Sequence, residues 1–160
     1  MTQSSEIVTI VSKDGKEFRV NENAIKISSV FSNLLELHKE EEDNLENCRI
    51  PILNVEGNIL KEIIRYCEYH YQNKGTDNHE FIDDEDIDEW DLNLIMDLEK
   101  EKENGHRDIL EVAIAADYLN IPKLFNIYAK HLARKIRSYD AEKIIKYFYI
   151  PKQEETANIN

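Results

Sequence analysis

The stretch from Asp108 to Ile136 is the longest apolar-rich run in the sequence, and it constrains the fold more than any other feature. Its first part, residues 109–119, is apolar almost all the way round a helical wheel, and only Glu111 and Asp117 interrupt it. A helix that is apolar on all sides is normally buried on all sides. The pattern therefore predicts a central core helix over residues 109–119.

The second part of this run, residues 122–136, predicts an amphipathic helix. Pro122 suits the first turn, where a missing backbone N–H leaves no hydrogen bond unmade. Apolar residues then recur every three or four positions, which places them on one helical face. That face comprises Leu124, Phe125, Tyr128, Ala129, Leu132 and Ile136, while Lys123, Lys130, Arg134 and Arg137 occupy the other side. The central question for function is what this apolar face packs against.

The first twenty residues predict a β-hairpin. Residues 6–11 are rich in β-branched side chains, which is typical of a strand. Asp14 and Gly15 suit a tight hairpin turn, because such turns need a positive φ. Phe18 and Val20 then belong to the returning strand.

The remaining elements predict an α+β domain, with a small sheet packed against helices. Residues 49–53 form a further strand, and Pro51 indicates that it lies at an edge of the sheet. Helices are predicted over residues 30–37, 54–71, 90–98 and 141–149. Their predicted N-caps are, in the same order, Ser28 or Ser29, Asn54, Asp88 and Asp140, and Asn21 is predicted to cap a further short helix. The 54–71 helix buries Ile59, Leu60, Ile63, Ile64 and Cys67, and acidic loops cover residues 39–46 and 72–89.

The charge and cysteine content limit the classes of function. A net charge of −13 repels phosphate backbones, so the sequence argues against nucleic-acid binding. No stretch is long enough to span a membrane. The two cysteines, Cys48 and Cys67, cannot form a disulfide framework, which favours a reducing compartment, cytoplasmic or nuclear.

No group of residues predicts catalysis or a cofactor. The four glycines are isolated, so they cannot build a phosphate-binding loop. Cys67 and His70 share one helix face, but a zinc site needs a second pair of ligands, and a core cysteine with a surface histidine is the preferred interpretation. Burial of Cys67 would also raise its pKa and lower its reactivity. The acidic residues 83–91 lack the spacing of a calcium loop. We therefore predict a protein that is not an enzyme and that has no cofactor and no metal.

Four segments together resemble the S-phase kinase-associated protein 1 (Skp) family, the adaptors of SCF ubiquitin ligases. They are residues 12–20 (SKDGKEFRV), 49–55 (RIPILNV), 66–70 (YCEYH) and 115–121 (AADYLNI), with an acidic loop leading to Trp90-Asp91. The resemblance spans about residues 6–150. Elongin C shares the hairpin and the Ala115-Ala116 run but lacks the helices after Ile121, so it is the poorer match.

The resemblance implies a BTB/POZ-type fold over residues 1–120, a helical F-box-docking extension over 121–150 and a polar tail over 151–160. It implies a non-enzymatic adaptor that links a cullin scaffold to F-box substrate receptors for ubiquitin-dependent degradation. Asp117 and Tyr118 match positions that contact the cullin in relatives. The positions implied for F-box binding are Leu110, Ile114, Leu124, Tyr128, Leu132, Ile136, Ile144, Ile145 and Phe148.

Two departures and several alternatives accompany this resemblance. Asp117 replaces the usual asparagine, and the sequence ends at Asn160 without the tryptophan-containing helix of relatives, which predicts a smaller F-box surface.

Asp117 could equally form a salt bridge within the fold, and the apolar faces of the last two helices could pack on each other. The alternative function is a BTB-type scaffold that self-associates as a homodimer without F-box partners. A third hypothesis for the function is a cysteine-dependent enzymatic activity at Cys48 or Cys67.

Overall fold

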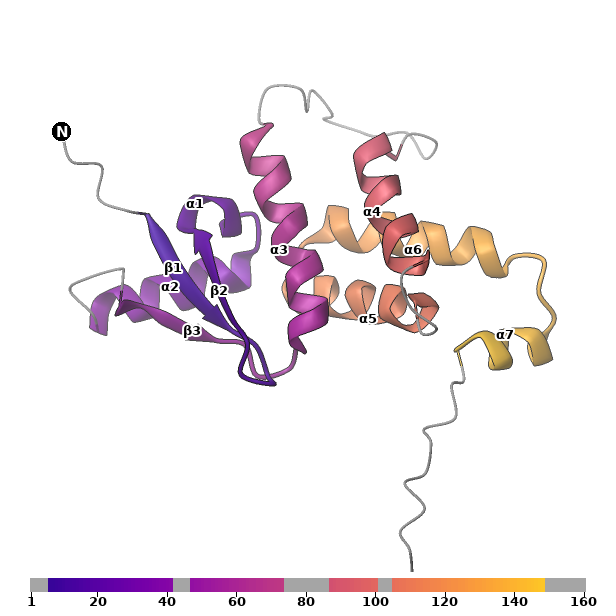
Figure 1. Ribbon diagram of the computed structural model, residues 1–160, viewed down its shortest axis with the longest axis horizontal. Helices are drawn as coiled ribbons and strands as arrows, with labels where there is room; N and C mark the ends of the chain where they lie inside the picture. The colour runs from indigo at the N-terminus through magenta and orange to yellow at the C-terminus, as the bar shows by residue number, and fades with distance from the viewer. Residues whose placement is uncertain (1–5, 42–46, 74–86, 101–104, 149–160) are drawn as a thin grey trace, which may run out of the picture.

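The computed structural model describes residues 6–41, 47–73, 87–100 and 105–148. Within these ranges the chain forms three strands and seven helices, which confirms the predicted α+β class. The strands are β1 (Ile7–Val11), β2 (Glu17–Asn21) and β3 (Arg49–Pro51), and the helices are α1 (Glu22–Ile25), α2 (Ser29–Glu41), α3 (Gly57–Gln72), α4 (Glu89–Lys100), α5 (Gly105–Tyr118), α6 (Pro122–Ile136) and α7 (Ala141–Phe148). The sheet lies at one end, the C-terminal helices lie at the other, and α3 stands between them (Figure 1).

The sheet has the strand order β2-β1-β3. β1 and β2 form the predicted antiparallel hairpin, and β3 pairs parallel to β1. Ile10 lies opposite Phe18 on one side and Ile50 on the other, so their side chains share a face. β3 is an edge strand, as Pro51 predicts, because proline has no N–H to donate to a further strand.

The start of α3 is stabilised by the hairpin turn and not by a residue next to the helix. The predicted cap at Asn54 is wrong, because the helix begins at Gly57 and its N-cap residue, Glu56, makes no side-chain capping bond. The Gly57 N–H instead donates to the Asp14 carboxylate at 2.8 Å. A Cβ at Gly57 would lie 2.5 Å from the Lys16 side chain, so glycine permits this close approach. The turn therefore fixes the sheet against α3.

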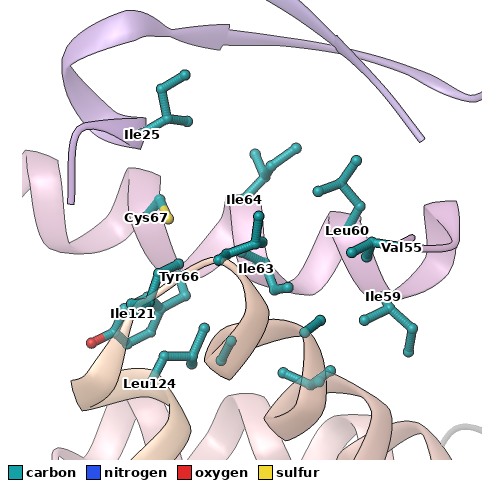
Figure 2. Close-up of a cluster of buried hydrophobic side chains, with 14 of the residues drawn as sticks. Ile25, Val55, Ile59, Leu60, Ile63, Ile64, Tyr66, Cys67, Ile121 and Leu124 are labelled. Carbon is teal, nitrogen blue, oxygen red and sulfur yellow. The ribbon is translucent and has the colours of Figure 1, made fainter. Parts of the chain in front are cut away.

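α3 is the centre of the core. The predicted stripe Ile59, Leu60, Ile63, Ile64 and Cys67 is buried, which confirms it, and Tyr66 is buried as well. Ile25 of α1 approaches one side of α3, while Ile121 and Leu124 lie on the side that carries Tyr66 (Figure 2). Burial raises the pKa of the Cys67 thiol to about 12, so this cysteine is an inert core residue, as predicted.

α4 is attached to α3 by a buried polar contact. The expectation of a surface histidine at position 70 is wrong, since His70 is buried with Nε2 2.8 Å from the Asp91 carboxylate. The neighbouring Trp90 ring stacks on Tyr69 with 3.8 Å between centroids. The predicted cap is confirmed, because the Trp90 N–H donates to Asp88 at 3.1 Å. A buried hydrogen bond and an aromatic stack thus orient α4 on the C-terminal half of α3.

α5 is buried on most of its surface but not all round. Ile109, Val112 and Ala116 are buried, and the helix contacts α3, α4, α6 and α7. The prediction of burial on every side is wrong, because Ile114 and Tyr118 are 58% and 46% exposed. An exposed apolar strip therefore runs along the outer face of this core helix.

The end of α5 is a tight turn in the geometry of a Schellman motif. The Ile121 N–H donates to the Ala116 carbonyl at 2.9 Å, and the Asn120 N–H donates to the Asp117 carbonyl at 3.0 Å. Asn120 has φ +53°, the left-handed conformation that this motif requires and that asparagine tolerates. The 115–121 run is thus explained as a sharp helix end that leads directly into α6.

This turn is joined to the N-terminal half of the chain through α2. The buried Ser28 hydroxyl donates to the Leu119 carbonyl at 2.5 Å and accepts from the Phe31 N–H at 3.1 Å. Asn120 donates through its side chain to the Ser29 hydroxyl at 2.7 Å. Ser28 therefore acts both as the predicted cap of α2 and as the link to the α5–α6 turn.

The remaining predictions are mostly confirmed. Pro122 opens α6, and Asp140 caps α7 by accepting from the Lys143 N–H at 2.8 Å. Asn21 caps α1 by accepting from Asn23. α2 continues to Glu41, so the acidic loop predicted from residue 39 begins later. Most of the 72–89 loop and all of the 151–160 tail lie outside the described residues.

The left-handed turn gives a test of this fold. Asn120→Gly and Asn120→Val both remove the side-chain bond to Ser29, but only valine is strained at φ +53°. We expect Asn120→Val to lower the free energy of unfolding by about 1–2 kcal/mol more than Asn120→Gly. Urea denaturation of the two variants measures the difference, and equal stabilities would contradict the turn geometry.

The Asp14 contact gives a second test, through pH. The Ser12 hydroxyl, which donates to Asp14 at 2.5 Å, lowers the pKa of this carboxyl below its ordinary value of 3.8, and the Gly57 N–H adds to the effect. The stabilisation is therefore fully present above the unfolded pKa and is lost as pH falls through the folded one. Asp14→Asn should lower Tm at neutral pH, and the difference should shrink as the pH falls below about 4.

The matched control for Asp14 is Glu40→Gln, which removes an exposed carboxylate from α2. It changes the net charge equally and leaves the hairpin turn intact. A Tm difference for Asp14→Asn that stays constant from neutral pH to pH values below about 3 would show that the carboxylate does not stabilise the turn.

Candidate functional site

A hollow of about 530 Å³ lies on the exposed side of α5. We call it the α5 groove; its lining is Lys13, Asn54, Val55, Glu56, Ile59, Arg107, Glu111, Ile114, Ala115 and Tyr118. Val55 and Ile59 are buried, whereas Ile114 and Tyr118 project into solvent. The groove therefore has an apolar floor and two exposed apolar side chains at its edge.

The α5 groove is bordered by paired charges. The side chains of α5 in the groove follow the three-and-four spacing of one helical face. Arg107 Nε lies 3.2 Å from the Glu111 carboxylate, and Lys13 Nζ lies 3.4 Å from the Glu56 carboxylate. Each of these charged side chains beside the apolar centre is therefore paired with one of opposite charge. Such an arrangement, with an apolar centre and a polar rim, is typical of a protein interface.

Asp117 and Tyr118, the positions predicted for cullin contact, both lie exposed at the end of α5. Ile114 was expected on the F-box side, but the structure places it beside Tyr118 in the α5 groove. The four-residue spacing of these two side chains on one helix could have indicated this. Sequence reasoning missed Lys13 and Val55, because the fold alone brings the hairpin turn and the start of α3 to this face.

A second exposed surface is carried by α7. α7, all of which the structure describes, fully buries none of its side chains. Ile145 is 62% exposed, and Ile144 and Phe148 are half-buried beside it. We call these three residues the α7 face. In Figure 1, α7 lies beyond the C-terminal end of α6, opposite the α5–α6 turn.

The other residues predicted for F-box binding lie deeper. Leu110 and Ile136 are half-buried. Three more form part of the core, with exposed fractions of 1% for Leu124, 1% for Tyr128 and 6% for Leu132. Burial, helped by the negative charges of Glu62 and Asp91, raises the pKa of Tyr128. In this conformation the three core residues hold α6 in place and do not line a surface.

Within the described ranges, no three His, Cys, Asp or Glu side chains converge to hold a metal ion. Among the helices that the structure describes, none combines the length and apolarity needed to cross a membrane.

Comparison with known proteins identifies relatives along almost the whole chain. The domain described as "Skp1 family, tetramerisation domain" matches residues 6–72. "SKP1-like protein 12" of Arabidopsis thaliana is 32% identical over 157 residues, covering 95% of this chain and 92% of its own length. "Suppressor of kinetochore protein 1" of Schizosaccharomyces pombe is 32% identical over 149 residues, covering 90% and 85%.

A third relative is the "E3 ubiquitin ligase complex SCF subunit sconC" of Arthroderma benhamiae, which is 31% identical over 157 residues and covers 92% of this chain and 88% of its own length. The matched domain is a POZ domain, which agrees with the small sheet and the helices around it. The BTB/POZ-type fold with a helical C-terminal region is therefore confirmed. The chain belongs to the Skp1 family.

Proposed function

We propose that this chain is a non-enzymatic adaptor of an SCF-type ubiquitin ligase, linking a cullin scaffold to F-box substrate receptors. The observation that carries the proposal is the presence of two separate exposed apolar surfaces on one core. The α5 groove runs beside Tyr118 at the end of α5, and the α7 face lies at the other end of the α5–α6 pair (Figure 1). An adaptor needs two surfaces that can be occupied at once.

The α5 groove is the proposed cullin site. Ile114 and Tyr118 lie four residues apart on a helix that is otherwise anchored in the core, so both are held rigidly. Their exposed area and the hollow beside them suit an apolar face of a partner helix. Asp117 lies next to this site and adds a negative charge at its border. Aromatic and aliphatic anchors at the centre of an interface usually supply most of its binding energy.

The α7 face is the proposed F-box site. Ile145, Ile144 and Phe148 leave apolar area in water, and covering it stabilises a complex by about 25 cal/mol for each Å² removed from water. Ile136 and Leu110, both half-buried, offer further apolar area on α6 and α5. The buried residues Leu124, Tyr128 and Leu132 contribute indirectly by fixing α6.

The relatives support the same function. One relative is named as an SCF subunit of an E3 ubiquitin ligase complex, and the similarity covers nine-tenths of this chain. We infer by this similarity that the chain serves ubiquitin-dependent protein degradation, in the cytoplasm or the nucleus. In the absence of an F-box protein, two copies could cover their α7 faces against each other as a homodimer.

Two exposed residues allow the sites to be tested separately. Ile114→Asp should weaken binding of a cullin amino-terminal domain by roughly 30-fold, about 2 kcal/mol, and leave F-box binding unchanged. Ile145→Asp should do the reverse. Isothermal titration calorimetry measures both affinities for both variants. The partners are a cullin fragment and an F-box segment encoded by the same genome as this chain.

The controls and the contradicting result follow from burial. Leu37→Asp alters another exposed apolar residue, 58% exposed on α2, and should leave both affinities unchanged. Tyr128→Asp and Leu132→Asp are unsuitable, because they place a charge in the core and would unfold the chain. If the unsubstituted chain binds neither partner, or if Ile114→Asp weakens only F-box binding, the assignment of the sites is wrong.

A further inference from the structure

The attachment of α7 needs an explanation, because this helix buries so little. It has eight residues, and helices this short do not form stably on their own. Its apolar contacts come from half-buried side chains, chiefly Tyr147 and Phe148 against the core. Something beyond apolar burial must therefore hold α7 in a defined orientation.

The carboxylate of Glu99 occupies the position where α4, α6 and α7 meet. Lys135 of α6 donates a hydrogen bond to Glu99 Oε1. The Tyr147 hydroxyl of α7 donates a long hydrogen bond of 3.5 Å to the same oxygen. His131 of α6 places Nε2 3.6 Å from the other oxygen, Oε2. One side chain thus contacts both neighbouring helices.

The carboxylate at the centre of this cluster is partly sheltered from water. The side chains of Glu99 and His131 are only 22% and 17% exposed. Hydrogen bonds to an ionised group are about twice as strong as neutral ones, and partial burial reduces their screening by salt. Burial and the nearby Arg134 lower the pKa of His131, so this ring does not add a second full positive charge at neutral pH. Lys135 therefore remains the main countercharge to Glu99.

Tyr147 connects this cluster to the α7 face. It precedes Phe148 directly, and the two rings meet edge to face with 5.1 Å between centroids. On its other side, Tyr147 contacts the Tyr139 ring at 5.8 Å. A shift of the Tyr147 hydroxyl away from Glu99 would consequently turn Phe148 and the rest of the α7 face.

We infer that Glu99 is a positioning residue, which fixes α7 through Lys135 and Tyr147 and so preorganises the α7 face for a partner. The inference rests on the proposed function only where it names the partner as an F-box. A preformed surface binds more tightly because less conformational freedom is lost on binding.

Hydrogen exchange tests the positioning role without any partner. In Glu99→Gln, the α7 amides should exchange roughly tenfold faster, while the amides of α3 keep their protection. Tyr147→Phe removes one hydroxyl and keeps the ring, so it should give the same local effect without risk to folding. Asp97→Asn, an exposed carboxylate on the same helix, is the matched control and should change nothing.

The double variant makes this test specific. If the carboxylate acts through the hydroxyl, Tyr147→Phe should add little to the effect of Glu99→Gln. Independent, additive effects would overturn the inference, and so would unchanged α7 exchange in either single variant.

Titration with the F-box segment extends the test to binding. Glu99→Gln and Tyr147→Phe should each weaken the affinity by roughly fivefold, with the cullin affinity unchanged. If the α7 amides respond but the F-box affinity does not, α7 positioning does not serve partner binding and that part of the inference is wrong. If the unsubstituted chain fails to bind any F-box segment, the proposed function fails, while the exchange result still decides the role of Glu99.

Discussion

Close packing of α5 against its neighbours is the constraint on which the rest of this structure depends. Ile109, Val112 and Ala116 of α5 are buried, and the helix packs against α3, α4 and α6. The Asp14–Gly57 contact fixes the sheet to α3, and α3 in turn packs against α5. At its far end, the left-handed Asn120 turns the chain into α6 at once. The position of every exposed residue proposed for function therefore follows from where α5 lies.

The same helix explains how one small domain presents two surfaces. Ile114 and Tyr118 lie on the exposed side of α5, and the same helix also contacts α7. The α5 groove is formed by segments that are distant in the sequence and that pack on a core helix. The α7 face, in contrast, lies on a short helix held by the polar cluster around Glu99. We expect the first surface to be the more rigid and the second to respond more readily to substitutions outside it.

Sequence reasoning succeeded where the cause is local. The hairpin follows from Asp14-Gly15, the α6 start from Pro122, the α7 start from Asp140 and the buried stripe of α3 from its apolar period. It failed where the partner is distant in the chain. The side chain that caps α3 belongs to Asp14, 43 residues away. His70 is buried with a hydrogen bond to the carboxylate of Asp91, which is 21 residues away.

The candidate site divides in the same way. The apolar period predicted the face of α7, whereas only the family resemblance pointed to a partner contact at Asp117 and Tyr118, which are both exposed. It could not show that Leu124, Tyr128 and Leu132 are covered by the chain itself, because periodicity identifies an apolar face without identifying what packs on it. Periodicity likewise could not show that Ile114 lies beside Tyr118 in the α5 groove, since the residues around it in the sequence are mostly apolar.

We propose that the α5 groove and the α7 face are separate and can be occupied together. Sedimentation velocity of the chain with a cullin amino-terminal domain and an F-box segment tests this most directly. The structure predicts a single 1:1:1 species, in which the affinity for each partner is unchanged by the other. Mutually exclusive binding, with only binary complexes at saturating concentrations of both partners, would contradict it.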